Sequence, residues 1–206
     1  MEAVLVDDVP LSAWHGPSST HGGRQYGEMI VALRHFLASV AGARPDLAAI
    51  SRLTTDLESW SSRLQTMQVG EADQVYARRP DLVGRGQATW PALSFTRCTS
   101  DVLEARVRFD RFFLGRNGVV HGGVITLIFD EMAGRLAQVG DKGIARTAYL
   151  RTNFRKPTPI DTDLTIIARN DREEGRKSFL NITLHDGETL YAEADVLMVR
   201  LQAGQQ

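Results

Sequence analysis

The chain has 206 residues, of which 43% are hydrophobic, so it is long enough for one domain with an appendage. Its 24 basic residues nearly balance its 25 acids, and this argues against nucleic acid as an obligate partner because phosphate binding needs excess positive charge. The single cysteine, Cys98, excludes an internal disulfide framework and a cysteine-based zinc site. No basic region precedes an apolar core near the N-terminus, so we expect no signal peptide, no membrane span and a cytoplasmic location.

The N-terminal part is expected to be a lead-in followed by two helices. Residues 1–23 are rich in proline and glycine and show little periodicity, which predicts a poorly ordered segment. Residues 24–68 carry apolar side chains at three- and four-residue steps, with a stop at Gly42 and a new start at Pro45-Asp46. Neither helix can bury its apolar stripe alone, so the hairpin must pack on itself, on the outer face of a sheet or on another subunit. Its polar faces mix both charges, unlike a basic membrane-surface helix.

Residues 69–92 are expected to form a linker, because prolines and glycines interrupt any long element. Trp90 is a candidate anchor to the core. The arginines Arg78, Arg79 and Arg85 could meet anionic phosphates, but a solvated loop is the preferred interpretation.

The remaining chain predicts an antiparallel sheet that begins near Leu93. Residues 102–109 alternate between polar and apolar side chains, which is typical of a half-exposed strand. Further strands are expected at 146–155, 162–171, 176–185 and 189–199, and Asp186-Gly187 is a strong two-residue hairpin signal. Residues 93–201 therefore form an α+β domain in which one helix precedes an antiparallel meander.

The helix of this domain is expected within residues 117–138, where a glycine-rich turn leads into an almost wholly apolar run. A helix that is hydrophobic all round must be wrapped by the rest of the protein. Asp130 and Glu131 lie inside this segment, and a buried carboxylate is costly without a partner or a purpose.

His121-Gly122-Gly123, with an acid nine residues after the histidine at Asp130, resembles the hotdog-fold acyl-CoA thioesterases. The strand that begins at Thr147 resembles the one that follows the helix in a branch of that family. The resemblance covers roughly residues 90 to 200. It implies a hotdog fold, in which an antiparallel sheet wraps a central helix. It also implies hydrolysis of acyl-CoA or acyl-carrier-protein thioesters in fatty acid metabolism, no cofactor besides the CoA of the substrate, and a homodimer or tetramer with the active site between subunits.

The first residues of the helix are candidates for polarising a thioester carbonyl. Backbone N–H groups at a helix start attract negative charge, and glycine lets a ligand approach closely. Gly122 and Gly123 both qualify, and the resemblance favours the N–H of Gly123. Asp130 is the candidate catalytic carboxylate, either as a general base for water or as a nucleophile. The resemblance assigns Thr147 to assist Asp130, and His121 either contacts the thioester or fixes the turn.

The resemblance also implies residues that bind the substrate. Asn153, Arg155 and Lys156 lie where related enzymes tend to place the CoA nucleotide, although a solvated strand end is an equal alternative. Many relatives carry asparagine or glutamine six residues before the histidine, where this chain has Gly115. Either Asn117 substitutes for that residue or the polar contact is absent.

Glu131 lies about 100° round the helix from Asp130, so both acids do not face one substrate. We expect Glu131 to be structural, either capping strand backbone or pairing with Arg135.

A second His-Gly-Gly, at His21, is followed nine residues later by Ile30 and not by an acid, which favours a flexible turn there. The main alternative to an enzyme is a non-catalytic acyl-CoA-binding or scaffold protein, motivated by Gly115 and by the added hairpin. A hotdog hydratase is disfavoured because position 135 holds arginine where those enzymes typically place histidine.

Overall fold

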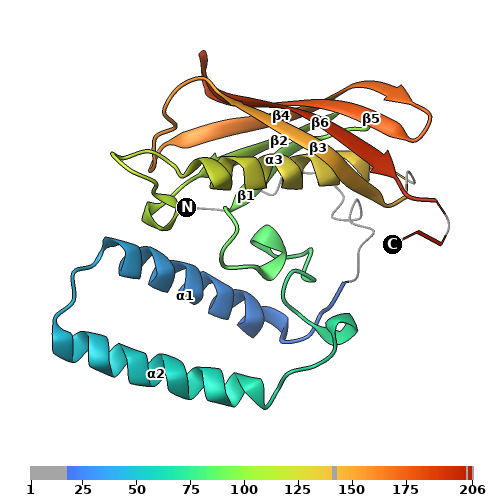
Figure 1. Cartoon of the computed structure of the whole chain (residues 1–206). Helices are drawn as coiled ribbons and strands as arrows, with labels where there is room; N and C mark the ends of the chain where they lie inside the picture. The colour runs from blue at the N-terminus through green and yellow to red at the C-terminus, as the bar shows by residue number, and fades with distance from the viewer. Residues whose placement is uncertain (1–17, 141–142, 203, 206) are drawn as a thin grey trace.

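The computed structural model describes residues 18–140, 143–202 and 204–205. It consists of an α+β domain and an N-terminal helical hairpin (Figure 1). In the domain, helix α3 (Gly122–Ala137) lies against one face of a sheet, and the hairpin, of α1 (Gly23–Gly42) and α2 (Leu47–Gln65), lies on that same side. Of the three packing positions considered for the hairpin, the outer face of the sheet is therefore not the one it takes. The lead-in predicted for residues 1–23 falls largely outside the described residues.

The sheet has six strands, all paired antiparallel, in the order β1-β2-β4-β5-β6-β3. The predicted hairpin at Asp186-Gly187 is present, but its two loop residues are Gly187 and Glu188, since Asp186 pairs with Thr189 and Gly187 has a positive φ of 46°. The α+β class is confirmed. Of the predicted meander, β4, β5 and β6 follow one another as expected, but β3 pairs with β6 at the edge of the sheet and not with β4. The strands are β1 (Leu93–Cys98), β2 (Val102–Arg108), β3 (Ala145–Phe154), β4 (Asp163–Glu174), β5 (Lys177–Asp186) and β6 (Thr189–Arg200).

The core lies between the sheet and α3. In β2 the predicted alternation is confirmed, because Leu103, Ala105 and Val107 are buried. Every second residue of β4, β5 and β6 is buried on the sheet face that α3 covers. Helix α3 contributes Ile128, Phe129 and other apolar residues to the same core. This arrangement of a sheet around a central helix is the expected hotdog fold.

Helix α3 is not enclosed on every side within one chain. Its sheet-facing residues are buried, but Gly123 and Asp130 are exposed and Leu127 is half-buried. The expectation that the chain wraps the helix completely is wrong, because the sheet covers it from one side only. Only Glu131, of the two acids, is buried.

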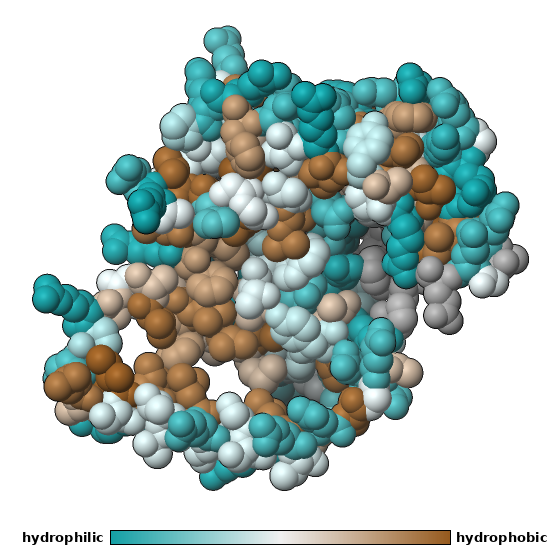
Figure 2. Space-filling view, viewed as in Figure 1, coloured by the Kyte–Doolittle hydropathy of each residue, from teal (hydrophilic) through white to brown (hydrophobic). Residues whose placement is uncertain are grey.

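The two helices of the hairpin begin close to their predicted positions. Asp46 caps α2 by accepting a hydrogen bond of 2.7 Å from the N–H of Ala49, and Pro45 precedes the cap instead of standing in the first turn. Helix α1 packs on two short 3₁₀ helices. These are η3 (Val83–Gly86), in the segment before the sheet, and η4 (Arg111–Phe113), in the α+β domain. The two helices make few contacts with each other, and Figure 2 shows an opening between them.

The segment 69–92 is more ordered than a solvated linker. It contains η3 and a further 3₁₀ helix, η2 (Glu71–Asp73), and it buries Arg79 and Gln87. The prediction of a solvated loop is wrong for Arg79 and Arg85, because both side chains are largely buried and each guanidinium pairs with a carboxylate. Trp90 is half-buried beneath the Arg85 guanidinium, 5.5 Å from the ring centroid.

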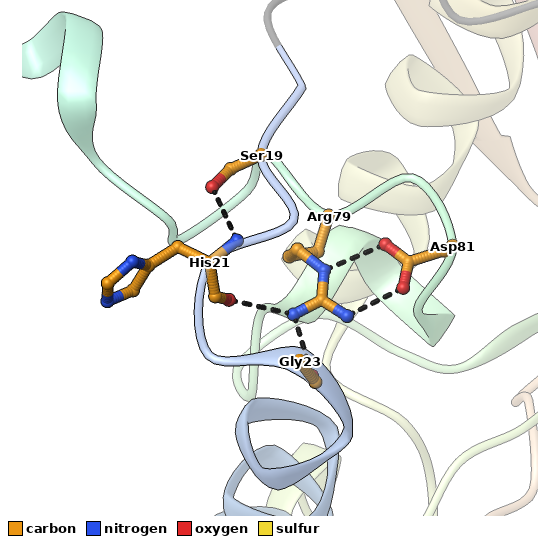
Figure 3. Close-up of polar contacts among 5 residues, drawn as sticks. All are labelled: Ser19, His21, Gly23, Arg79 and Asp81. Atoms are coloured by element: carbon orange, nitrogen blue, oxygen red, sulfur yellow. Dashed lines mark hydrogen bonds and ion pairs between the residues drawn. The ribbon is translucent and has the colours of Figure 1, made fainter.

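Arg79 fixes the start of α1 (Figure 3). Its guanidinium donates to the carboxylate of Asp81 at 2.8 and 2.6 Å and to the carbonyls of His21 and Gly23, each at 3.0 Å. This hydrogen bonding lowers the pKa of the Asp81 carboxyl. The second His-Gly-Gly is therefore a tethered helix start and not a flexible turn, and the ring of His21 points away from the cluster.

Candidate active site

His121 caps helix α3 with its own side chain. Its Nδ1 accepts a hydrogen bond of 3.1 Å from the N–H of Gly123, in the way that a short polar side chain caps a helix. The ring thereby occupies the donor that the resemblance assigns to the thioester carbonyl. A carbonyl that reaches Gly123 must share this N–H or displace the ring.

The turn before His121 explains the departure at Gly115. A Cβ at Gly115 would lie 3.2 Å from the Cα of His121, so the backbone leaves little space for a side chain. Asn117 and Gly118 both have positive φ, and the N–H of Val119 donates to the carbonyl of Arg116 at 3.0 Å. This is the geometry for which an Asn-Gly pair is favoured. The side chain of Asn117 is exposed at this tip, and its contact with substrate stays a prediction.

Asp130 and Thr147 are in direct contact. The hydroxyl of Thr147, on β3, donates to Oδ1 of Asp130 at 2.7 Å, and the same Oγ1 lies 3.4 Å from the sulfur of Met198. Two residues that are distant in the sequence thus form one polar pair. The pair lies at an exposed position, where both water and a ligand can reach the carboxylate.

A β-bulge turns Thr147 toward the helix. The pairing of β3 with β6 shifts between Thr147 and Tyr149, so Ala148 is the extra residue. Leu150 packs against the core, and strict alternation would turn Thr147, three residues earlier, to the opposite face. The bulge reverses that outcome. Sequence alternation alone carries no signal for it.

Gly123 and Asp130 lie on the same exposed side of α3. They are seven residues apart, which is close to two turns and about 10.5 Å along the axis. That spacing is too long for a single thioester carbonyl to touch both groups within one chain.

A groove of about 440 Å³ runs beside the start of α3 and contains three of the predicted site residues. Gly122, Arg155 and Lys156 line it, together with Phe154, Thr158 and neighbouring apolar residues. Gly122 packs closely on Phe154, since a Cβ there would lie 3.1 Å from the ring. Sequence reasoning missed Phe154 and Thr158. The aromatic residue at the end of β3, directly before two cations, was the available signal for Phe154.

Two of the predicted CoA-binding residues, Arg155 and Asn153, are less available to a ligand in the groove than Lys156. Arg155 forms an ion pair with Glu193 on β6, so its charge is partly compensated. Asn153 lies between Thr152, whose hydroxyl is 3.2 Å from that of Thr126 on α3, and Phe154 at the groove. Because strand residues alternate, Asn153 faces the other side of the sheet and does not line the groove.

Glu131 forms a buried ion pair network and not a second catalytic group. Its carboxylate accepts from Nε of Arg135 at 2.8 Å and from Arg85 at 3.0 Å, and its side chain is 8% exposed. Burial lowers the pKa of the Arg85 guanidinium, and the charge of Glu131 opposes that shift. The predicted pairing with Arg135 is present, and Arg85 ties the segment 69–92 to α3 beside Asp130.

Neither a metal cluster nor a membrane-spanning helix occurs in the part of the chain that the structure describes. No group of three or more His, Cys, Asp or Glu side chains in residues 18–140, 143–202 and 204–205 is arranged to hold a metal ion. Within the same ranges, no helix is both long and apolar enough to cross a bilayer.

The sequence matches known proteins in the α+β domain. The family model of the thioesterase superfamily matches residues 117–193. The acyl-coenzyme A thioesterase THEM4 of Mus musculus is 37% identical over 89 residues, which are 42% of this chain and 38% of the mouse protein. THEM4 of Bos taurus is 35% identical over 92 residues, 44% of this chain and 37% of the bovine protein. The matched region thus spans less than half of the length of these curated relatives.

Solved structures extend the likeness beyond this domain. The crystal structure of a thioesterase superfamily protein, 21% identical, superposes with a TM-score of 0.71 and covers 89% of this chain and 93% of that chain. AziG of S. sahachiroi, 24% identical, has a TM-score of 0.50 and covers 53% of this chain and 91% of its own. Residues 93–201 are roughly half of the chain, so a match that covers 89% of it must also include part of the N-terminal helices.

Proposed function

We propose that the protein hydrolyses acyl-CoA thioesters, or acyl-carrier-protein thioesters, to a free acid and a thiol, because residues 117–193 match the family model of the thioesterase superfamily. The observation that carries the proposal is the contact between Thr147 and Asp130 at 2.7 Å. It places an oriented carboxylate on the exposed side of α3, at the spacing from Gly123 that two copies can use.

In this mechanism the start of α3 polarises the thioester carbonyl. The N–H of Gly123 and the positive end of the helix dipole stabilise the oxygen as negative charge develops on it. His121 releases or shares that N–H when the carbonyl arrives, since its Nδ1 accepts from it at 3.1 Å. The histidine then holds the donor in place until substrate binds.

Asp130 attacks or activates the attacking group. As a general base it takes a proton from water, whose oxygen adds to the carbonyl carbon and expels the thiolate of CoA. As a nucleophile it adds directly and forms an anhydride that water then cleaves. Both routes consume one water and release one acid and one thiol. Thr147 orients the carboxylate in either route.

The CoA portion of the substrate is assigned to the groove beside Gly122. Lys156 and Arg155 supply positive charge for its phosphates, and the Phe154 ring offers an apolar surface. To bind a phosphate, the Arg155 guanidinium must give up part of its contact with the Glu193 carboxylate. Asn117 and Asn153 stay as predicted substrate contacts, with less support because neither lines the groove. The substrate brings its own CoA, and the proposal includes no other cofactor.

Two copies of the chain complete the site in this proposal. Gly123 and Asp130 share the exposed side of α3 at a separation of about 10.5 Å. When two α3 helices lie antiparallel across a two-fold axis, Gly123 of each copy meets Asp130 of the other and two equivalent sites form. A homodimer, or a tetramer of such pairs, is therefore the working form. We place the activity in the cytoplasm and in fatty acid metabolism as part of the same proposal.

The alternative is an acyl-CoA-binding protein without turnover. It is favoured by one observation, that the Gly123 N–H is already taken by His121. If the ring stays in place, the carbonyl is bound without being polarised and hydrolysis does not follow.

Thiol release separates the two functions. The full chain and its Asp130→Asn variant are assayed side by side with short, medium, long and aromatic acyl-CoAs, and circular dichroism confirms that both are folded. If the wild type releases thiol and the variant loses most of that activity, the thioesterase is supported. The acyl-CoAs that are hydrolysed then identify the acyl class. If both proteins are inactive while an acyl-CoA raises the Tm of each, the binding protein is supported instead.

A further inference from the structure

Both helices of the N-terminal hairpin leave an apolar stripe exposed. Along α1 the stripe includes Met29, Leu33 and Val40, and along α2 it includes Leu57, Trp60 and Leu64, all between 39% and 60% exposed. The residues recur at steps of three and four, which is the pattern of helices that pack side by side. Such a pattern predicts a partner helix for each stripe.

The hairpin does not supply that partner itself. No residue of α2, which lies wholly within the described chain, is buried, and α1 and α2 make few contacts with each other. Figure 2 shows an opening between the two helices, with apolar residues gathered on this face around α1 and at the ends of α2. A helix of this length without tertiary packing is marginal in water, so a cover is needed.

The charges of the hairpin point to the identity of the cover. Residues 23–67 contain five arginines and four acids, so the surface is close to neutral. An anionic membrane or a nucleic acid would favour a clearly basic face. A two-fold contact instead joins one patch to the same patch, which suits an apolar stripe flanked by charges of both signs.

The size of the surface also fits a second copy. Two helices about 30 Å long and about 10 Å wide present a face on the order of the ~800 Å² per partner that stable interfaces bury. The hairpin is also not confined to this chain, since a solved structure that covers 89% of this chain must include part of it. A second copy of this chain is therefore the partner that fits the charge and the size of this surface.

We propose that the hairpins of two copies of this chain pack together into a four-helix bundle, with the α2 stripes meeting near Leu57. In this arrangement the stripes become the buried core of the bundle. The contact is distinct from the pairing of α3 helices, and it does not rest on the proposed thioesterase activity.

Cross-linking tests the contact directly. In a Cys98→Ser background, Leu57→Cys places a thiol in the middle of the α2 stripe, and Ser62→Cys places the matched control on the opposite side of the same helix. A short bis-maleimide is added to each purified full-length protein. We expect a covalent dimer from Leu57→Cys and mainly monomer from Ser62→Cys. Equal yields from the two variants, or no dimer from Leu57→Cys, would overturn the proposal.

A dilution series measures how much the stripe contributes to assembly. The pair Leu57→Glu/Trp60→Glu is compared with Thr55→Glu/Ser62→Glu, on the far side of α2, using light scattering after size exclusion. The stripe variant should dissociate at a concentration at least about tenfold higher than wild type, because each copy loses two apolar contacts. The control should match wild type. Identical dissociation of all three proteins would contradict the bundle.

Discussion

Thr147 and Asp130 form the polar pair on which the proposed catalytic role of Asp130 rests. The hydroxyl donates to Oδ1 at 2.7 Å, so it holds the carboxylate in one orientation. Thr147→Val keeps the shape and removes the donor. We expect thiol release to fall by about 10- to 100-fold, since a hydrogen bond to a charged group contributes about 1.5–3 kcal/mol and 1.36 kcal/mol is tenfold in rate. Steady-state kinetics should show the loss in kcat.

Thr152→Val is the matched control for this variant. Thr152 is on the same strand, and its hydroxyl also contacts α3, at 3.2 Å from Thr126, but it does not touch Asp130. Activity within a few-fold of wild type is expected for the control, and Thr147→Ser should recover most of the loss. A similar fall in kcat for both valine variants would mean that strand packing, and not the contact with Asp130, is responsible.

Arg85 and Glu131 contribute to stability, not to the chemistry. The Glu131 carboxylate is 8% exposed and Arg85 is 11% exposed at the side chain, so removing Arg85 takes one of two charged partners from a buried carboxylate and leaves it with Arg135. Arg85→Ala should lower the free energy of unfolding by about 2 kcal/mol. Urea denaturation measures this change.

The exposed pair of Arg108 and Asp163 provides the comparison for Arg85. Its atoms are 3.5 Å apart, and the side chains are 54% and 79% exposed. Arg108→Ala should cost less than about 1 kcal/mol because solvent screens the pair. Equal losses for the two arginines would show that the network around Glu131 is no more important than a surface ion pair.

At the scale of elements, the start of α1 depends on one salt bridge. Arg79 ties the carbonyls of His21 and Gly23 to the carboxylate of Asp81, and this hydrogen bonding lowers the pKa of Asp81. A carboxyl with a lowered folded pKa stabilises the protein above its unfolded pKa, about 3.9, and loses that effect as the pH falls through the folded value.

Asp81→Asn should therefore be less stable than wild type at neutral pH, with a gap that narrows as the pH falls below about 4. Tm values of both proteins measured along a pH series test this. Asp163→Asn, which removes an exposed partner, should stay close to wild type at neutral pH. A gap for Asp81→Asn that is constant down to low pH would exclude charge as its cause.

The whole molecule has to be at least a pair for the proposed site to work. Gly123 and Asp130 are about 10.5 Å apart on one helix, so in the proposed pair each copy contributes one half of each site. Asp130→Asn and Gly123→Val should each abolish most activity alone. A heterodimer of the two, isolated with two different tags, contains one intact site in two and should recover about half of wild-type activity.

The activity of the heterodimer is compared with that of the two variant homodimers. Homodimers of each variant, prepared in the same way, should stay inactive, and circular dichroism should show that Gly123→Val is folded. A heterodimer without activity, from two folded variants, would place both groups of one site in the same chain.

Local pattern was enough to predict much of this protein. The alternation in residues 102–109, the Asp186-Gly187 turn and the apolar run after Gly123 each follow from side chains a few positions apart, so the sequence determined the strands, the hairpin and the central helix. The pairing of Glu131 with Arg135 also followed, because residues four apart share a helix face.

Tertiary structure alone decided which side chains meet across elements. The bulge at Ala148 turns Thr147 toward Asp130, and the ion pair of Arg85 with Glu131 joins residues 46 positions apart. The exposure of Asp130 and of the α2 stripe likewise depends on where the sheet and the hairpin end. These features arise from long-range packing and strand register, which local periodicity does not encode.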